Sequence, residues 1–133
     1  IKMSELNNIA LKIIGNGKGI LAADESTGTM TKRLENVKVK SSSENRLKFR
    51  HTLFSSKSMT TCIGGVILYD ETIKQEFDSR KIPKIISDKG AVPGIKVDTG
   101  AKKLANSSEE KITEGLDGLR DRLKEYYKLG ARS

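Results

Sequence analysis

The stretch from Gly19 to Gly28 reads Gly-Ile-Leu-Ala-Ala-Asp-Glu-Ser-Thr-Gly, and the organisation of the chain can be worked out from it. Its apolar residues, 20–23, stop abruptly at two carboxylates, two hydroxyls and a glycine. An apolar run of this length between turn residues predicts a buried strand, with the polar cluster just beyond its carboxyl end. In parallel sheets and barrels, that end of the strands carries the chemistry.

The remaining segments alternate between helical and strand patterns. Leu6, Ile9 and Ile13 recur at helical spacing and predict a first helix that ends at Gly15. After the strand at 20–23, the predicted order is a helix at 26–36, a helix that begins within 41–43 and runs through 54, a strand at 62–69, a weak helix at 73–77, a short helix at 82–89, a strand at 92–97, a polar loop at 106–113, a helix at 117–129 and the start of a fourth strand at 131–133. This order favours parallel strands with right-handed crossovers, in an α/β doubly wound sheet or barrel.

Length and composition indicate one ordinary globular domain over residues 1–133. No apolar stretch approaches the roughly 18 residues needed to span a membrane, so no membrane association is expected. The net charge of +8 comes from basic residues spread among 17 acids, with three Phe, three Tyr and no Trp. Nucleic-acid surfaces usually show clustered basic groups and aromatic residues, so nucleic acid is not expected as a partner. A solvated basic surface is favoured, and a site for small phosphorylated molecules is the alternative.

Cysteine and histidine usage argue against disulfide and metal chemistry. The single Cys62 lies in an apolar run, so we expect a small buried hydrophobe in a reducing compartment. The opening residues lack the features of an export signal, and a cytoplasmic location is therefore expected. The single His51 has no cysteine or second histidine beside it and is expected to be half-buried or exposed.

Charged residues stand at the carboxyl end of every predicted strand. The pairs are Asp24 with Glu25, Asp70 with Glu71, and Lys96 with Asp98. Their convergence at one end of the sheet predicts an active-site face. Lys96, flanked by Ile95 and Val97, is costly there unless it meets an anionic group. It either forms a structural ion pair with Asp24 or Asp98, binds a phosphate or carboxylate, or acts as an acid/base partner of Asp24.

The residues that follow the first strand have both structural and functional interpretations. Asp24 could cap a helix or pair with a lysine, but Ser26 or Thr27 can cap equally well and leave Asp24 free to act as a base or to position a hydroxyl. Ser26 and Thr29, near a helix amino terminus, could hold phosphate oxygens, although capping accounts for both hydroxyls equally well. Arg33 is a surface residue unless it points back over the site.

Four blocks of the chain resemble the class I fructose-bisphosphate aldolase family. They are residues 17–27, 64–72, 94–98 and 115–119, and they stand in the family's order over nearly the whole chain. The resemblance implies a (β/α)8 (TIM) barrel that assembles as a homotetramer. It also implies reversible, metal-independent and cofactor-free cleavage of fructose 1,6-bisphosphate to dihydroxyacetone phosphate and glyceraldehyde 3-phosphate through a lysine Schiff base.

The resemblance assigns roles to individual residues. Asp24 matches the aspartate that handles the hydroxyl proton during carbon–carbon cleavage. Lys96 matches a strand-three lysine near a substrate phosphate, Ser26 and Thr29 match hydroxyls that contact phosphate, and Arg33 matches a substrate-binding arginine. Many relatives have serine at the position of Thr29, which keeps the hydroxyl. Arg46 matches an arginine sometimes implicated in binding and ranks lower, because its helix is expected to lie away from the strand ends.

The match extends over about three of the eight strands of such a barrel. The family's Schiff-base lysine and acid/base glutamate have no counterparts in these residues, so we expect the 133-residue chain alone to be inactive and to need further strands for cleavage. The alternative hypothesis is a non-catalytic basic protein, derived from an aldolase fragment, that binds acidic partners or nucleic acid through its lysines.

Overall fold

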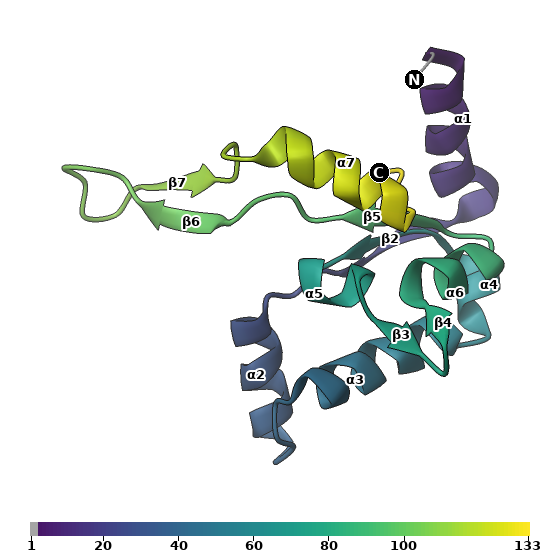
Figure 1. Cartoon of the computed structure of the whole chain (residues 1–133), viewed down its shortest axis with the longest axis horizontal. Helices are drawn as coiled ribbons and strands as arrows, with labels where there is room; N and C mark the ends of the chain where they lie inside the picture. The colour runs from purple at the N-terminus through teal and green to yellow at the C-terminus, as the bar shows by residue number, and fades with distance from the viewer. Residues whose placement is uncertain (1–2) are drawn as a thin grey trace.

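A three-stranded parallel sheet lies at the centre of the chain (Figure 1). The computed structural model describes residues 3–133. Residues 1 and 2 of the domain expected over 1–133 lie outside the described residues. The strand order is β1 (Gly19–Ala23), β2 (Ile63–Leu68) and β5 (Val92–Ile95). All three strands expected from the apolar runs are therefore confirmed, and so is the parallel arrangement.

The helices follow the strands in the expected order. The helical elements are α1 (Met3–Ile14), the 3-10 turn η1 (Gly15–Gly17), α2 (Thr27–Asn36), α3 (Ser43–Ser55), α4 (Ser58–Cys62), α5 (Asp70–Ile73), α6 (Ile82–Asp88) and α7 (Leu119–Leu129). Ser26 and Ser42 cap α2 and α3, because their hydroxyls accept hydrogen bonds from the backbone three residues on. None of the helices described between residues 3 and 133 has the length and apolar character needed to cross a membrane.

Two antiparallel hairpins depart from the sequence prediction. The weak helix expected at 73–77 is one turn, α5, followed by β3 (Glu76–Phe77) and β4 (Arg80–Lys81). The polar loop expected at 106–113 is partly strand, because β6 (Gly100–Lys103) pairs with β7 (Lys111–Glu114). The second hairpin projects from the body (Figure 1), and its strands are largely exposed, so they lack the alternation that reveals a half-buried strand.

One hydrophobic cluster fills the space between the sheet and the helices. Its buried residues are Ala23, Phe54, Met59, Val66, Leu68, Ile73, Ile82, Ile85, Ile86, Ala91, Tyr126 and Ala131. Strand β1 contributes only Ala23 as a fully buried residue, and Ile20 is 55% exposed. The prediction of a buried first strand is therefore wrong in part, because β1 is an edge strand with one face open. Cys62 is exposed at the end of α4, so its prediction as a buried hydrophobe is wrong.

The last residues of the chain run alongside β5. Gly130 ends α7 in the left-handed conformation, with φ of 115°. The Arg132 amide donates to the Pro93 carbonyl at 2.8 Å, and the Ile95 amide donates to the Ser133 carbonyl at 2.9 Å. No strand is assigned at 131–133, but these two bonds continue the ladder where a fourth strand is expected.

Helix α1 packs against the middle strand at a position where only glycine fits. A Cβ atom at Gly64 would lie 1.8 Å from the carbonyl oxygen of Ile13, which is a backbone atom and cannot rotate away. Residue Gly65 faces the Ile13 side chain, where a Cβ atom would lie 3.1 Å from a methyl group. The absence of side chains at 64 and 65 thus lets α1 cover the amino-terminal part of β2.

We therefore predict that Gly64→Ala destabilises the chain by more than about 3 kcal/mol, beyond the usual cost of overpacking, because backbone must move. Gly28→Ala is the matched control: nothing lies within 4 Å of its Cβ position, and alanine within a helix is favoured by roughly 0.5–1 kcal/mol. Urea unfolding followed by circular dichroism measures both. Equal free energies of unfolding for the two variants would contradict the contact between α1 and β2.

Candidate active site at the carboxyl ends of the strands

Strand register brings the predicted site residues to one edge. Ala23 is in register with Leu68, and Leu68 is in register with Ile95. Asp24 and Lys96 are the next residues on the two outer strands, and the Lys96 amide still bonds to the Leu68 carbonyl at 3.0 Å. Two strand spacings separate them, which places their Cα atoms about 10 Å apart. The register thus confirms that the carboxyl ends of the three strands lie at one edge of the sheet.

Asp24 is the acid at this edge that is not committed to a partner. It is half-buried, and its carboxylate makes no hydrogen bond or ion pair to the residues described between 3 and 133. The capping role that was an alternative for Asp24 belongs instead to Ser26, whose hydroxyl accepts from the Thr29 amide at 3.4 Å. The Asp24 carboxylate is therefore available to a molecule placed over the strand ends.

The hydroxyls of Ser26 and Thr29 lie together at the amino terminus of α2. Their oxygens are 3.2 Å apart, Ser26 is half-buried and Thr29 is exposed. The unpaired amides of the first helical turn carry partial positive charge and favour an anion. Both hydroxyls point into this region while Ser26 also caps the helix, so the structural and functional interpretations are compatible.

The Arg33 side chain points back toward the end of β1, although part of it is exposed to solvent. It lies near the end of α2, and its guanidinium forms an ion pair with Glu25. The Arg33 side chain is 55% exposed, whereas that of Glu25 is 14% exposed. The orientation that a binding role requires is thus present, with a carboxylate holding the guanidinium and an exposed portion left to meet a ligand.

Lys96 is paired with Asp98, one of the two partners proposed from the sequence. The ammonium donates to one carboxylate oxygen of Asp98, and the Gly100 amide donates to the other at 3.0 Å. The hydrogen bond from Lys96 lowers the pKa of Asp98. Lys96 remains 29% exposed, so the pair holds the ammonium at the edge without enclosing it.

A hollow of about 450 Å³ adjoins this pair, between the ends of β2 and β5 and helix α7. Asp70 lies in it and accepts hydrogen bonds from the Tyr126 hydroxyl and from Lys74, each at 2.8 Å. Burial would raise the pKa of Asp70, but the hydrogen bonds from Lys74 and Tyr126, together with the charges of Lys74 and Arg122, outweigh burial and lower it. The three acids that line the hollow, Asp70, Asp98 and Glu125, are matched by three basic side chains, Lys74, Lys96 and Arg122.

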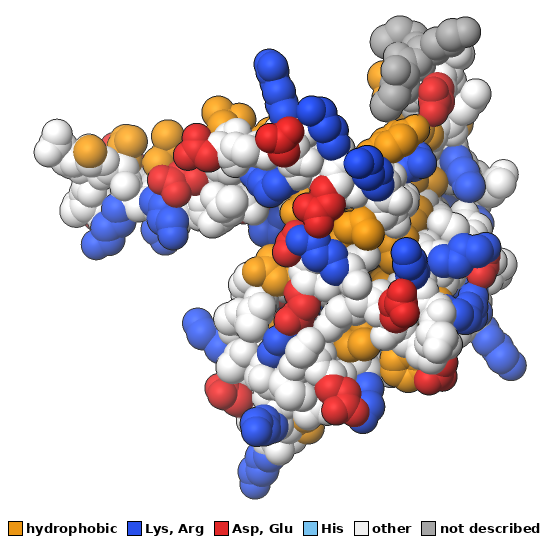
Figure 2. Space-filling model, in the orientation of Figure 1, with side chains coloured by type: hydrophobic (Ala, Val, Ile, Leu, Met, Phe, Trp, Pro, Cys, Tyr) orange, Lys and Arg blue, Asp and Glu red, His pale blue; other side chains and the backbone are white. Residues whose placement is uncertain are grey.

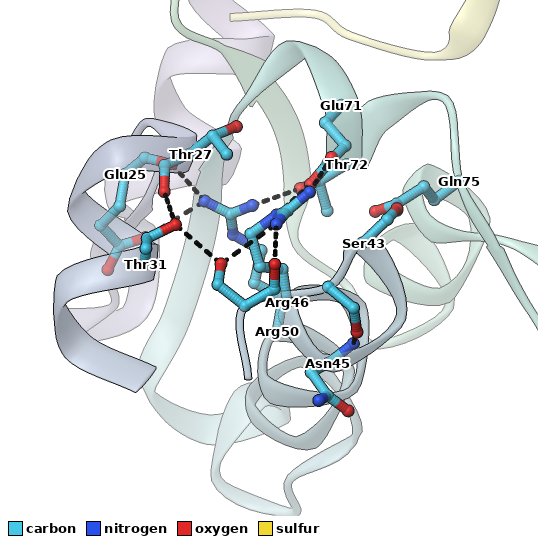
Figure 3. A network of polar contacts seen from close by, with 12 residues as sticks. Glu25, Thr27, Thr31, Ser43, Asn45, Arg46, Arg50, Glu71, Thr72 and Gln75 are labelled. Carbon is cyan, nitrogen blue, oxygen red and sulfur yellow. Dashed lines mark hydrogen bonds and ion pairs between the residues drawn. The ribbon is translucent and has the colours of Figure 1, made fainter. Parts of the chain in front are cut away.

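A buried polar network beneath the edge was not anticipated (Figure 3). Arg46 donates to both carboxylate oxygens of Glu71, at 2.8 and 2.6 Å. Arg50, which is 1% exposed, donates to the Thr72 hydroxyl at 2.8 Å and to the backbone carbonyl of Glu25. The placement of Arg46 away from the strand ends is wrong, because Glu71 lies three residues beyond β2.

One sequence signal could have revealed this network. Arg46 and Arg50 are four residues apart, on the same face of α3 as the buried Phe54. A helix face that points to the core normally carries apolar residues there, and two arginines on it require buried anionic or carbonyl partners. The acids after β1 and β2 were available to supply those partners.

On the face seen in Figure 2, lysine and arginine side chains are interspersed with acids rather than gathered into one patch. This distribution matches the solvated basic surface that composition favours. His51 is half-buried as expected and stacks on Phe77, with ring centroids 3.6 Å apart. Among residues 3–133, no group of three or more His, Cys, Asp or Glu side chains is placed to hold a metal ion.

Comparison with known proteins gives the geometry a family. Residues 5–133 match the family described as glycolytic fructose-bisphosphate aldolase class-I. The chain is 54% identical over 129 residues to the non-muscle fructose-bisphosphate aldolase of Lethenteron camtschaticum, covering 96% of this chain and 35% of that protein. It is 47% identical over 133 residues to a probable class 1 aldolase of Xylella fastidiosa, covering 99% of this chain and 40% of that protein.

A solved structure agrees with the sequence matches. Fructose-bisphosphate aldolase from Plasmodium falciparum, in a complex with TRAP and a small-molecule inhibitor, superposes with a TM-score of 0.92 at 45% identity. The superposition covers 97% of this chain and 38% of that one. The chain belongs to the class-I fructose-bisphosphate aldolase family, a family of lyases. It spans about 35–40% of the length of the relatives it matches.

The ion pair of Arg46 with Glu71 makes stability depend on pH. Hydrogen bonds from Arg46 lower the pKa of Glu71 below its ordinary 4.5. A carboxylate whose pKa is lower in the folded state stabilises that state above the unfolded pKa, and the stabilisation is lost as pH falls through the folded pKa. We predict a free energy of unfolding that decreases progressively below about pH 4.5.

Arg46→Met should remove part of this acid dependence and lower stability at pH 7 by roughly 1.5–3 kcal/mol, the range for hydrogen bonds to charged groups. Glu44→Gln is the control: the pair of Glu44 with Lys48 is highly exposed, so its loss should matter little. Urea unfolding between pH 3 and 7 tests both variants. An unchanged pH profile in Arg46→Met would show that the pair does not contribute.

Proposed function

We propose that this chain forms the amino-terminal part of the active site of a fructose-bisphosphate aldolase. The reaction is the reversible Schiff-base cleavage of fructose 1,6-bisphosphate to dihydroxyacetone phosphate and glyceraldehyde 3-phosphate, in glycolysis and gluconeogenesis. Family membership supports the reaction, and the observation that carries it to these residues is the shared strand register of Ala23, Leu68 and Ile95. That register puts an unpaired carboxylate and a partly exposed ammonium at one edge.

In this proposal each side chain has a chemical task. Asp24 accepts the hydroxyl proton of the substrate as the carbon–carbon bond breaks, which requires a carboxylate without a competing partner. Lys96, Arg33 and the hydroxyls of Ser26 and Thr29 bind substrate phosphates. The helix amino terminus at Ser26 and the fork of the Arg33 guanidinium suit phosphate oxygens, which supports these roles.

The setting of the protein is also a proposal. A homotetrameric (β/α)8 barrel in the cytoplasm, acting on a sugar phosphate, is what family membership supports. The open face and edge of β1 would then meet further strands of the barrel. The Schiff-base lysine lies outside these 133 residues, because no counterpart of it is found in the four matching blocks.

The test uses this chain joined in place of the matching region of Plasmodium falciparum aldolase, the solved relative at 45% identity. We predict cleavage of fructose 1,6-bisphosphate and a substrate adduct that borohydride traps. Asp24→Asn should lower kcat by about 10²–10⁴, the range for a lost general acid/base, and Lys96→Met should raise KM. Lys102→Met, on the projecting hairpin, is the control and should change neither constant.

Three results would contradict the proposal: no cleavage by the joined protein, an unchanged kcat in Asp24→Asn, or loss of activity to chelators without a trapped adduct. The 133-residue chain alone should show no turnover and no adduct. Turnover by that chain would indicate imine formation at Lys96. Salt-dependent binding to nucleic acid that sugar bisphosphate leaves unchanged would favour the non-catalytic alternative.

A further inference from the structure

Two arginines make the same unusual contact on two different βα connections. Arg50, in α3, donates to the backbone carbonyl of Glu25, the residue directly after Asp24. Arg122, in α7, donates to the backbone carbonyl of Val97 at 2.9 Å, the residue directly after Lys96. In both cases a guanidinium from a following helix holds the peptide unit that leaves the residue directly after a candidate site residue.

Each guanidinium also donates a hydrogen bond to a second acceptor. The two bonds together fix the position of the held backbone. Arg50 donates to the hydroxyl of Thr72, in α5 beyond the next strand, at 2.8 Å. Arg122 donates to the Gly115 carbonyl at 2.6 Å and thereby closes the long connection between β5 and α7. A guanidinium offers donors in a rigid planar fork, and a lysine ammonium cannot span both acceptors in the same way.

Stability alone is a weak reason for burying Arg50. It is 1% exposed, and its Nε has no hydrogen-bond partner among the described residues. Burial lowers its pKa, which reflects the cost of placing the cation there even with Glu25 nearby. Apolar side chains of similar volume often give equal or greater stability than a buried ion pair. The held carbonyl lies beside Asp24, which points to a role of Arg50 in positioning the backbone next to that carboxylate.

We propose that Arg50 and Arg122 are positioning residues that fix the backbone next to Asp24 and Lys96 and thereby hold these side chains for their separate tasks. Arg50 acts through Asp24, whose carboxylate handles the proton, and Arg122 acts through Lys96, whose ammonium binds a phosphate. The assignment of kinetic effects rests on the proposed function, whereas the fixing of the backbone does not. The two parts can therefore be tested separately.

The backbone is tested in the 133-residue chain itself, by ¹⁵N relaxation. The amides of Ser26 and Asp98 belong to the two held peptide units. In Arg50→Met, the order parameter of the Ser26 amide should fall from about 0.85 to below about 0.6, while that of Asp98 stays unchanged. Arg122→Met should give the reverse. Unchanged order parameters at both amides, or equal losses at both in each variant, would overturn the proposal.

The kinetic test uses the joined protein, with turnover expressed per site that borohydride traps. A small misplacement of a catalytic group is costly, so Arg50→Met should lower kcat by about tenfold to a hundredfold with KM within about twofold. Arg122→Met should raise KM by about tenfold with kcat nearly unchanged. A purely structural role would reduce the number of trapped sites and leave turnover per site unaltered.

Further variants keep the outcome decisive. Arg50→Lys retains the charge and one contact, so it should fold even where Arg50→Met does not and should recover part of kcat. Arg120→Met, an exposed arginine on the same helix as Arg122, should leave both constants unchanged. If Asp24→Asn lowers kcat but Arg50→Met and Arg50→Lys do not, positioning by Arg50 is wrong and the proposed function stands. If Asp24→Asn has no effect, the proposed function fails.

Discussion

The buried guanidinium of Arg50 is the contact on which the strand-end edge depends. In a medium of low polarity a cation must be surrounded by acceptors, and Arg50 draws in the Glu25 backbone, the Thr72 hydroxyl and, at 3.6 Å, the Glu25 carboxylate. The Glu25 side chain is thereby committed to the helix side of the sheet. The carboxylate of its neighbour Asp24 has no partner in the described chain, so Glu25 carries the structural contacts and Asp24 is left for the proton transfer of the proposed function.

The basic groups at the edge are restrained before any ligand arrives. Arg33 is held by Glu25, and Lys96 is held by Asp98. Side chains of this length lose considerable conformational entropy when a ligand orders them, and restraint by a neighbouring carboxylate lowers that cost. In the proposed function the same carboxylates would compete with a substrate phosphate for the cations. Binding strength would then be exchanged in part for a defined position of each charge.

Sequence patterns were sufficient for the parts of the fold that depend on apolar periodicity. The three strands, the capping by Ser26 and the ends of α1 and α7 all follow from local rules that burial reinforces. The exposed hairpin at 100–114 escaped because exposed strands need no alternation, and β1 was assigned too much burial because an edge strand has the composition of a central one. At the strand ends, the pattern brought Asp24 and Lys96 to one edge. The spacing of Arg46 and Arg50 could show that these arginines need buried partners, but not which ones, because the contacts of the arginines join residues 22 to 25 positions apart.

The projecting hairpin of β6 and β7 lies within the same connection that carries Lys96 at its start. Arg122 donates to the backbone on both sides of this hairpin, at Val97 before β6 and at Gly115 after β7. A Cβ atom at Gly115 would lie 2.9 Å from the Cα atom of Asp98. The base of the hairpin is therefore closed tightly, while its tip makes few contacts with the body. Because the base is held independently of the tip, a change in the length or sequence of the tip should leave the position of Lys96 unaltered.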